Sequence, residues 1–201
     1  DMGVGIVAAV EEVFPDIADF ICHFHFLRDV GKDVLLDDYQ NIIKQLRKHK
    51  MRALLRQKAR YLGRKTGLDT DVIAGFKTSM ENGEIKIDFL KQMPAHATYL
   101  LIHWAFESPS ESRGYGFPFD RPHHEFYRRL KEIRHLLKTI IDIDLHDKKS
   151  DHRPYIQVKQ LLDEVLDDKE LAESAASMED KAKVFDKLRE ALRIALPEGK
   201  N

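Results

Sequence analysis

Cysteine, glycine, proline and long apolar runs are all scarce in this sequence of 201 residues. A single cysteine excludes an internal disulfide, so we expect a reducing compartment, the cytoplasm. Ten glycines and seven prolines are too few for a loop-rich all-β fold or a low-complexity chain. No apolar run approaches the roughly 18 residues of a membrane helix, and the N-terminal residues lack the basic region of a signal peptide. We therefore expect no membrane partner.

Hydrophobic residues and charges are both plentiful. The hydrophobic share of 43% allows a real core, and the charged share of 33% suits long amphipathic helices with solvated faces. The net charge is −1, so any preference for a charged partner must come from how the charges are distributed. Because the sequence begins with Asp1, we expect the chain to be an internal piece of a longer protein.

The hydrophobic pattern predicts a mainly α chain with a short α/β portion at its N-terminus. Residues 18–24 are β-branched and aromatic, which favours a short buried strand. Residues 108–122 combine three prolines and two glycines with aromatic residues, which predicts a loop. Helices are expected at residues 4–14, 25–65, 71–92 (with a turn at Asn82-Gly83), 94–106, 123–141, 154–168 and 177–195.

Asp1, followed by Gly3 at the head of a helix, is the first candidate functional residue. A carboxylate where a strand ends and a helix begins is well placed to bind Mg²⁺, which prefers hard oxygen ligands. From residue type alone, the competing interpretation of a helix cap or a frayed chain end is favoured.

The segment Cys22-His23-Phe24-His25 is the second candidate. Alternation along a strand would place Cys22 and Phe24 on one face and the two histidines on the other. Cys22 and His25 make half of a zinc site, but the chain has no second cysteine pair to complete it. Spacing alone favours a buried cysteine beside hydrogen-bonded histidines.

The third candidate is a basic stretch at residues 41–65, which carries ten cations and no Asp or Glu. Uncompensated cations repel one another, and a phosphate backbone is the obvious compensating anion. Pairing with the acid-rich residues 163–190 of the C-terminal helices is an equally weighted alternative. The predicted DNA-binding residues are Lys44, Arg47, Lys48, Lys50, Arg52, Arg56, Lys58, Arg60, Arg64 and Lys65.

The first thirty residues combine these features in a characteristic order. The pieces are Asp1, Phe14-Pro15 with Ala18, Cys22 with His25, and Leu27-Arg28-Asp29. In this order they resemble the middle of a DDE-type transposase of the Mutator-like and related bacterial insertion-sequence group. In that resemblance Asp1 matches the second catalytic Asp, while the strand with the first Asp and the final Glu are absent from this chain.

The resemblance implies a partial RNase H-like catalytic core at residues 1–30 and a helical insertion domain at residues 31–201. It implies two-metal phosphoryl transfer that cuts and joins DNA, with Asp1 as a ligand for Mg²⁺ or Mn²⁺ in the full-length protein. Cys22 and His25 would shape the site behind it. We expect the fragment itself to be inactive and to hold no metal, and a homo-oligomer is a further expected partner.

Two interpretations from other classes compete with the transposase. One is a non-enzymatic helical module, with a basic helix on nucleic acid and acidic helices for a protein partner. The other is a zinc-stabilised regulator, which would bind one zinc per chain and unfold with a chelator.

Overall fold

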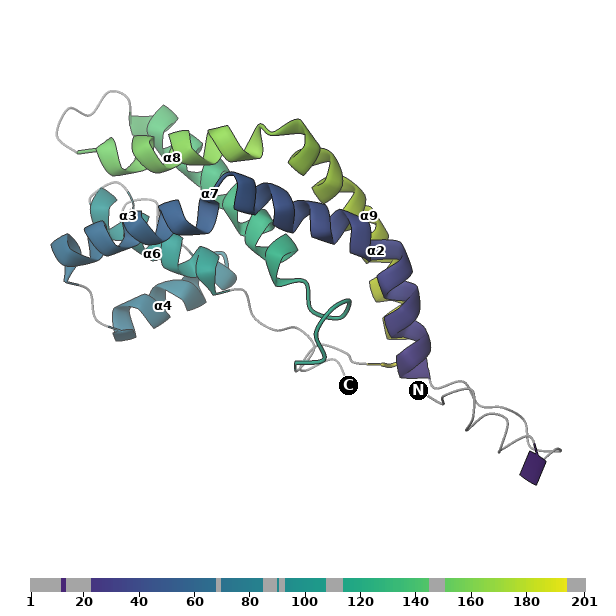
Figure 1. Cartoon of the computed structure of the whole chain (residues 1–201). Helices are drawn as coiled ribbons and strands as arrows, with labels where there is room; N and C mark the ends of the chain where they lie inside the picture. The colour runs from purple at the N-terminus through teal and green to yellow at the C-terminus, as the bar shows by residue number, and fades with distance from the viewer. Residues whose placement is uncertain are drawn as a thin grey trace. The chain divides into compact units, whose positions relative to one another are not determined.

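The computed structural model describes residues 12–13, 23–67, 70–84, 90, 93–107, 114–144 and 151–194. Within these ranges the chain is mainly helical and contains no β-strand, so the predicted mainly α class is confirmed. The helices are α2 (His23–Lys48), α3 (Met51–Thr66), α4 (Thr70–Glu81), α6 (Pro94–Phe106), α7 (Pro122–Asp144), α8 (Arg153–Leu166) and α9 (Lys169–Ala191) (Figure 1).

The helix predicted at residues 94–106 is confirmed in full, because α6 runs from Pro94 to Phe106. Proline suits this first position, where the missing N–H has no helical partner to lose. Helix α9 begins at Lys169, about two turns before the predicted start at residue 177. Asp168 explains the early start, because its Oδ1 accepts the backbone N–H of Leu171 at 3.0 Å and so caps the first turn.

The helical pattern predicted over residues 25–65 is confirmed, but it does not reveal the break at His49 and Lys50 that divides this stretch into α2 and α3. Lys50 adopts the left-handed conformation, with φ 49° and ψ 28°. A residue in this region ends one helix and redirects the chain before the next. Because of this break, α3 is a separate helix and does not continue the axis of α2.

The strand predicted at residues 18–24 is wrong where it can be checked, since His23 and Phe24 begin α2. The rest of that segment lies outside the described residues. A tertiary contact overrides the β propensity, because the ring of Phe24 stacks on Phe119 at 5.1 Å and Leu27, one turn later, is fully buried. Helix α2 also runs through the expected domain boundary at residue 30 without a break.

The chain forms two compact units that are discontinuous in sequence. Unit 1 comprises Asp1–Leu36, Ser110–Asp120 and Asp180–Asn201, and unit 2 comprises Asp37–Pro109 and Arg121–Glu179. Helices α2 and α9 contribute residues to both units.

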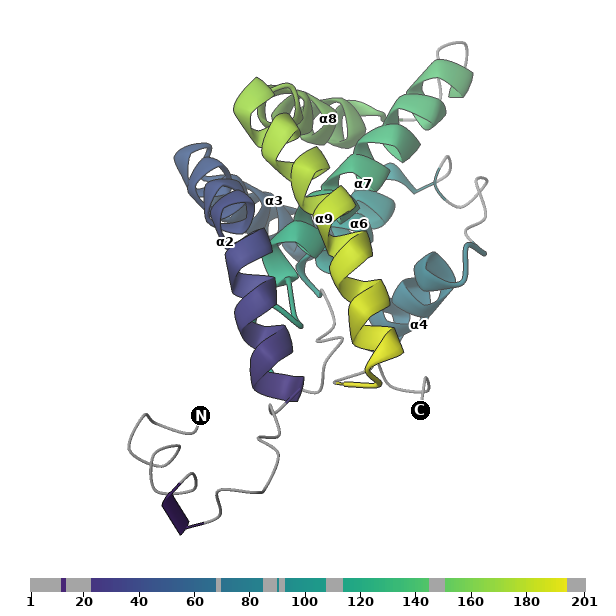
Figure 2. The same cartoon turned by 90° about the vertical axis from the view of Figure 1, so that its right-hand side faces the viewer.

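Unit 2 is built around α6, which packs against α3, α4, α7 and α8 (Figure 2). Most of α6 is apolar, and Leu100, Leu101 and Trp104 are almost completely buried. Burying a leucine side chain stabilises the fold by about 1.5–3 kcal/mol. The central helix therefore fixes where α3 lies, and α3 carries most of the predicted DNA-binding residues.

Unit 2 also contains an antiparallel contact between the second half of α2 and the first half of α9. We call its hydrogen bonds and ion pairs the polar seam. Its successive pairs are Asp38 with Ser177 (2.8 Å), Asn41 with Ser174 (2.7 Å), Lys44 with Glu170 (3.8 Å) and Lys48 with Asp168 (3.1 Å). Residue numbers rise on one helix as they fall on the other, which establishes the antiparallel arrangement.

Unit 1 is organised around Phe119 in the loop that precedes α7. Its ring is fully buried, stacks on Phe24 at 5.1 Å and lies 5.9 Å from the ring of Phe185. The guanidinium of Arg189 lies 5.6 Å from the same ring. Phe119, one of the aromatic residues of the predicted loop, is therefore part of the core of unit 1.

None of the described helices combines the length and the apolar character that a bilayer crossing requires.

Candidate nucleic-acid interface

The ten predicted DNA-binding cations lie on two consecutive helices with different surroundings. Lys44, Arg47 and Lys48 are on the last turns of α2, and Lys50 is in the break that follows. The other six are on α3, which has no acidic residue along its length. They are Arg52, Arg56, Lys58, Arg60, Arg64 and Lys65.

Two of the three predicted DNA-binding cations of α2, Lys44 and Lys48, follow the alternative of internal pairing. The polar seam joins Lys44 to Glu170 and Lys48 to Asp168. Asp168 also binds Nε2 of His49 at 2.9 Å. The hydrogen bond from His49, then those from Leu171 and Lys48, hold the pKa of the Asp168 carboxyl well below its usual range. Lys44 and Lys48 are thus compensated within the chain.

The cations of α3 have a different environment, since among the described residues none of them forms an ion pair with a carboxylate. Four arginines recur at every fourth residue, at positions 52, 56, 60 and 64. At 1.5 Å per residue this row is about 18 Å long. The first arginine is anchored, because the guanidinium of Arg52 lies 4.2 Å from the ring centre of Phe126. Arg60 and Arg64 are exposed.

A groove of about 440 Å³ runs along the side of α3 that faces α6. Arg56 and Arg60 line it from α3, and Tyr99, His103 and Phe106 line it from α6. Burial, and then the charge of Lys77, lower the pKa of His103. The imidazole is therefore neutral at pH 7, and the two guanidinium groups provide the positive charge of this groove.

Gly63 permits the close approach of α3 to α6 at this groove. A Cβ atom at position 63 would lie 3.0 Å from Cε2 of Tyr99, closer than most real contacts. The ring of Tyr99 in turn lies 4.4 Å from that of His103. The glycine thus explains how a groove with an aromatic floor forms beside two arginines.

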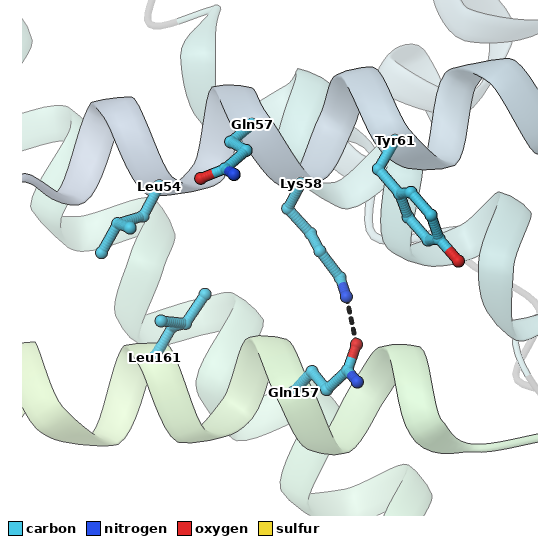
Figure 3. A pocket seen from close by; sticks show the side chains of 6 residues that line it. All are labelled: Leu54, Gln57, Lys58, Tyr61, Gln157 and Leu161. Carbon is cyan, nitrogen blue, oxygen red and sulfur yellow. Dashed lines mark hydrogen bonds between the residues drawn. The ribbon is translucent and has the colours of Figure 1, made fainter.

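A second pocket, of about 410 Å³, lies on the side of α3 that faces α8 (Figure 3). Lys58 reaches across it from α3 and donates a hydrogen bond to Oε1 of Gln157 on α8 (Figure 3). Tyr61 lies at the edge of this pocket with 52% of its surface exposed. An exposed tyrosine beside two cations, Lys58 and Lys65, is an arrangement that favours contact with nucleic acid.

The described structure does not test whether the residues expected to form a catalytic site come together. Asp1 and Cys22 lie outside the described residues, so their proximity to each other and to His25 is untested. His25 is in the first turn of α2, not on a strand, and its ring lies edge-on to Phe24 at 5.7 Å. Partial burial and the charge of Arg28 lower the pKa of His25.

No cluster of three or more His, Cys, Asp or Glu side chains able to hold a metal ion occurs in the described ranges. Asp1, the expected ligand for Mg²⁺, lies outside the described residues, so this search does not test it.

Sequence reasoning missed the parts of the interface that come from outside the basic stretch. Tyr99 and His103 are four residues apart on an apolar helix, a spacing that places them on one face but that is equally typical of a core. Tyr61 could have been found, because it is the one aromatic residue among the cations of residues 41–65. Gln157 carries no signal in the sequence.

Comparison of the chain with protein-family models, with curated proteins and with solved structures finds no match.

Proposed function

We propose that this chain is the helical part of a DDE-type transposase and that α3 binds the phosphate backbone of its DNA. The observation that carries the DNA-binding part is a difference between neighbouring helices. Lys44 and Lys48 on α2 pair with Glu170 and Asp168, whereas no cation of α3 forms an ion pair with a carboxylate among the described residues. Lys65 is near enough to Asp151 to help lower the pKa of that carboxyl, so the contrast is strongest for the arginines.

The difference matters because the chain contains enough acids to pair the whole basic stretch. Residues 163–190 alone hold ten Asp and Glu side chains. Where α3 faces α8, Lys58 donates its hydrogen bond to an amide, that of Gln157, rather than to an acid. Uncompensated guanidinium groups on one helix repel one another, and a polyanion removes that repulsion. The row of arginines therefore favours a phosphate backbone as its partner.

Binding of this kind gives affinity without sequence preference. Arginine and lysine contacts to phosphates position a protein on DNA, whereas sequence is read at the edges of the bases. Each neutralised phosphate releases counterions, so affinity falls steeply with salt, with a slope of about 0.9 for each contact on duplex DNA. This slope is the quantity to measure.

The transposase part of the proposal rests on the resemblance of the first thirty residues, from Asp1 to the Cys22 and His25 pair. The RNase H-like core and the transfer of DNA strands belong to the whole protein. We expect Asp1→Ala in the full-length protein to abolish transposition. A non-enzymatic binding module, the competing function, predicts no loss with the same change. We also expect the present chain alone to show no Mg²⁺-dependent strand transfer.

The DNA-binding part is tested by the salt dependence of binding to a duplex oligonucleotide, followed by fluorescence anisotropy. Arg60→Gln/Arg64→Gln removes two exposed cations that form no ion pair within the described ranges, and we expect the salt slope to fall by up to about 2. Lys44→Gln/Lys48→Gln is the matched control, because it removes the same formal charge from cations already paired with acids. Equal effects of the two double variants would contradict the role of α3.

A further inference from the structure

We propose that the pocket between α3 and α8 holds an unpaired nucleobase of a DNA single strand, with the base stacked on Tyr61. This inference rests on the proposed function, since it assumes that α3 contacts DNA, and it adds the form of DNA that α3 recognises. The pocket is the one lined by Leu54, Gln57, Lys58, Tyr61, Gln157 and Leu161 (Figure 3).

Tyr61 has the surroundings of a stacking platform. Its side chain is 52% exposed, although it is a large aromatic residue on a helix whose other face is buried. Nζ of Lys65 lies 4.9 Å from its ring centre, and Nζ of Lys58 lies 5.6 Å from it. A strand that stacks a base on this ring therefore finds two ammonium groups within reach of its phosphates. This combination of aromatic ring and cations binds single strands without regard to sequence.

Chemically distinct groups line the pocket, and together they match a nucleobase. Leu54 and Leu161 provide an apolar part for the flat face of the base. Gln57 and Gln157 each offer an amide with donors and an acceptor, as base edges require. The volume of about 410 Å³ lies within the range of small-molecule sites, and it exceeds what one side chain would fill.

Lys58 connects the two halves of this pocket. Figure 3 shows its side chain meeting Gln157 between the leucine pair and Tyr61. Entry of a base would replace this hydrogen bond. Gln157 would then present its amide to the base edge, and Lys58 would turn its ammonium group to a phosphate. Both partners keep a hydrogen bond in the bound state, so neither polar group loses its interactions.

An unpaired base fits this pocket better than a base pair does. The hydrogen-bonding edge of a paired base is occupied by its partner strand, so the two glutamines would find little to bind. Stacking on Tyr61 also requires a free face, which a base inside a duplex does not present. The arginine row on the opposite side of α3 has no such restriction, because it contacts phosphates of either form.

The test compares binding of the 201-residue chain to a single-stranded oligothymidine and to a duplex of equal length. We expect Tyr61→Ala to weaken single-strand binding by about 5- to 100-fold, which is the range for the loss of one stacked base. Duplex binding should change by less than about 2-fold. Tyr61→Phe keeps the ring and should stay within about 3-fold of the wild type. Tyr115→Ala is a matched control, because Tyr115 is 53% exposed but lies outside the pocket.

The salt slope separates stacking from charge. Tyr61→Ala should leave the slope for single strands unchanged, whereas Lys65→Gln should lower it by about 0.7. An oligonucleotide carrying 5-iodouracil should cross-link on irradiation to the tryptic peptide that contains Tyr61. The thermal unfolding of each variant is measured as well, and a melting temperature close to that of the wild type shows that the variant folds.

The proposal is overturned if Tyr61→Ala binds single strands like the wild type, or if it weakens duplex binding equally. In either case Arg60→Gln/Arg64→Gln still reports on the proposed function, because it acts through phosphates alone. Binding of both DNA forms that depends on Arg60 and Arg64 but not on Tyr61 therefore rejects only the base pocket. Salt-insensitive binding, or none, rejects the proposed function as well.

Discussion

The guanidinium of Arg129 closes the C-terminal end of α6 by donating a hydrogen bond from Nη1 to the backbone carbonyl of Trp104 at 2.6 Å. The same nitrogen donates to the carbonyl of Glu107 at 2.6 Å, and Nε donates to Glu125 at 2.9 Å. The group also lies 4.7 Å from the ring centre of Trp104. Arg129 is 3% exposed, and the carboxylates of Glu125 at 2.9 Å and Glu81 at 3.8 Å offset its charge.

Replacing Arg129 should therefore be among the most destabilising changes in unit 2. Arg129→Met leaves the carbonyls of Trp104 and Glu107 without this donor and removes one of the two arginines that bind Glu125. We expect a loss of about 3–5 kcal/mol in the free energy of unfolding, measured with urea. Arg128→Met is the control, because Arg128 binds the same carboxylate from an exposed position and should cost about 0–1 kcal/mol.

Gly31 on α2 is required by the contact of that helix with the loop before α7. A Cβ atom there would lie 2.3 Å from Cγ of Pro118 and 2.6 Å from the ring of Phe185. We expect Gly31→Ala to destabilise unit 1 by about 1–3 kcal/mol, because two packed side chains would have to move. Gly75→Ala on α4 has nothing within 4 Å of the new atom and should stabilise by about 0.5–1 kcal/mol. Thermal unfolding of both variants checks the opposite signs.

Asp168 should make stability sensitive to acid. His49, Leu171 and Lys48 depress the pKa of this carboxyl in the folded chain, whereas an unfolded Asp has a pKa near 3.9. The stabilisation is therefore present above about pH 4 and is lost as the pH falls further. Asp168→Asn keeps an oxygen for Leu171 but removes the titration, so the acid-induced loss should be smaller than in the wild type. Asp180→Asn, which removes an exposed carboxylate paired with Lys183, is the control variant.

DNA affinity should rise as the pH falls, through His103. Burial and Lys77 lower its pKa below 6.5, while Glu107 opposes them, so the imidazole gains its charge only below about pH 6.5. The added charge would lie in the groove of Arg56 and Arg60. We expect tighter duplex binding at pH 5.5 than at pH 7.5, and a smaller difference in His103→Gln. His135→Gln, an exposed histidine of α7, should behave like the wild type.

Periodicity in the sequence predicts the helical framework, and local backbone geometry explains where that prediction fails. The apolar stretch that follows Pro94 gives α6 within its observed bounds. The hydrophobic pattern continues as a helix through residues 49 and 50, because hydropathy does not reveal that Lys50 adopts the left-handed conformation. The strand assignment of Phe24 fails for a related reason, since its burial comes from Phe119, a residue distant in sequence.

The candidate interface is only half visible in the sequence. Charge counting finds the basic stretch, but it cannot tell Lys48, which Asp168 neutralises, from Arg60, which has no acidic partner among the described residues. That distinction requires knowing which helix lies beside which. Gln157 lines the pocket beside Tyr61 only because α8 packs against α3.

The polar seam between α2 and α9 affects the electrostatic attraction between the chain and a negatively charged surface. With a net charge of −1, the chain has almost no monopole to draw it toward a polyanion from afar. The seam already neutralises Lys44 and Lys48. The attraction between the guanidinium groups of α3 and an anion is screened beyond about 8 Å, the Debye length at physiological salt. Under the proposed function, we therefore expect the orientation of the chain at close range to decide whether an encounter with DNA leads to binding.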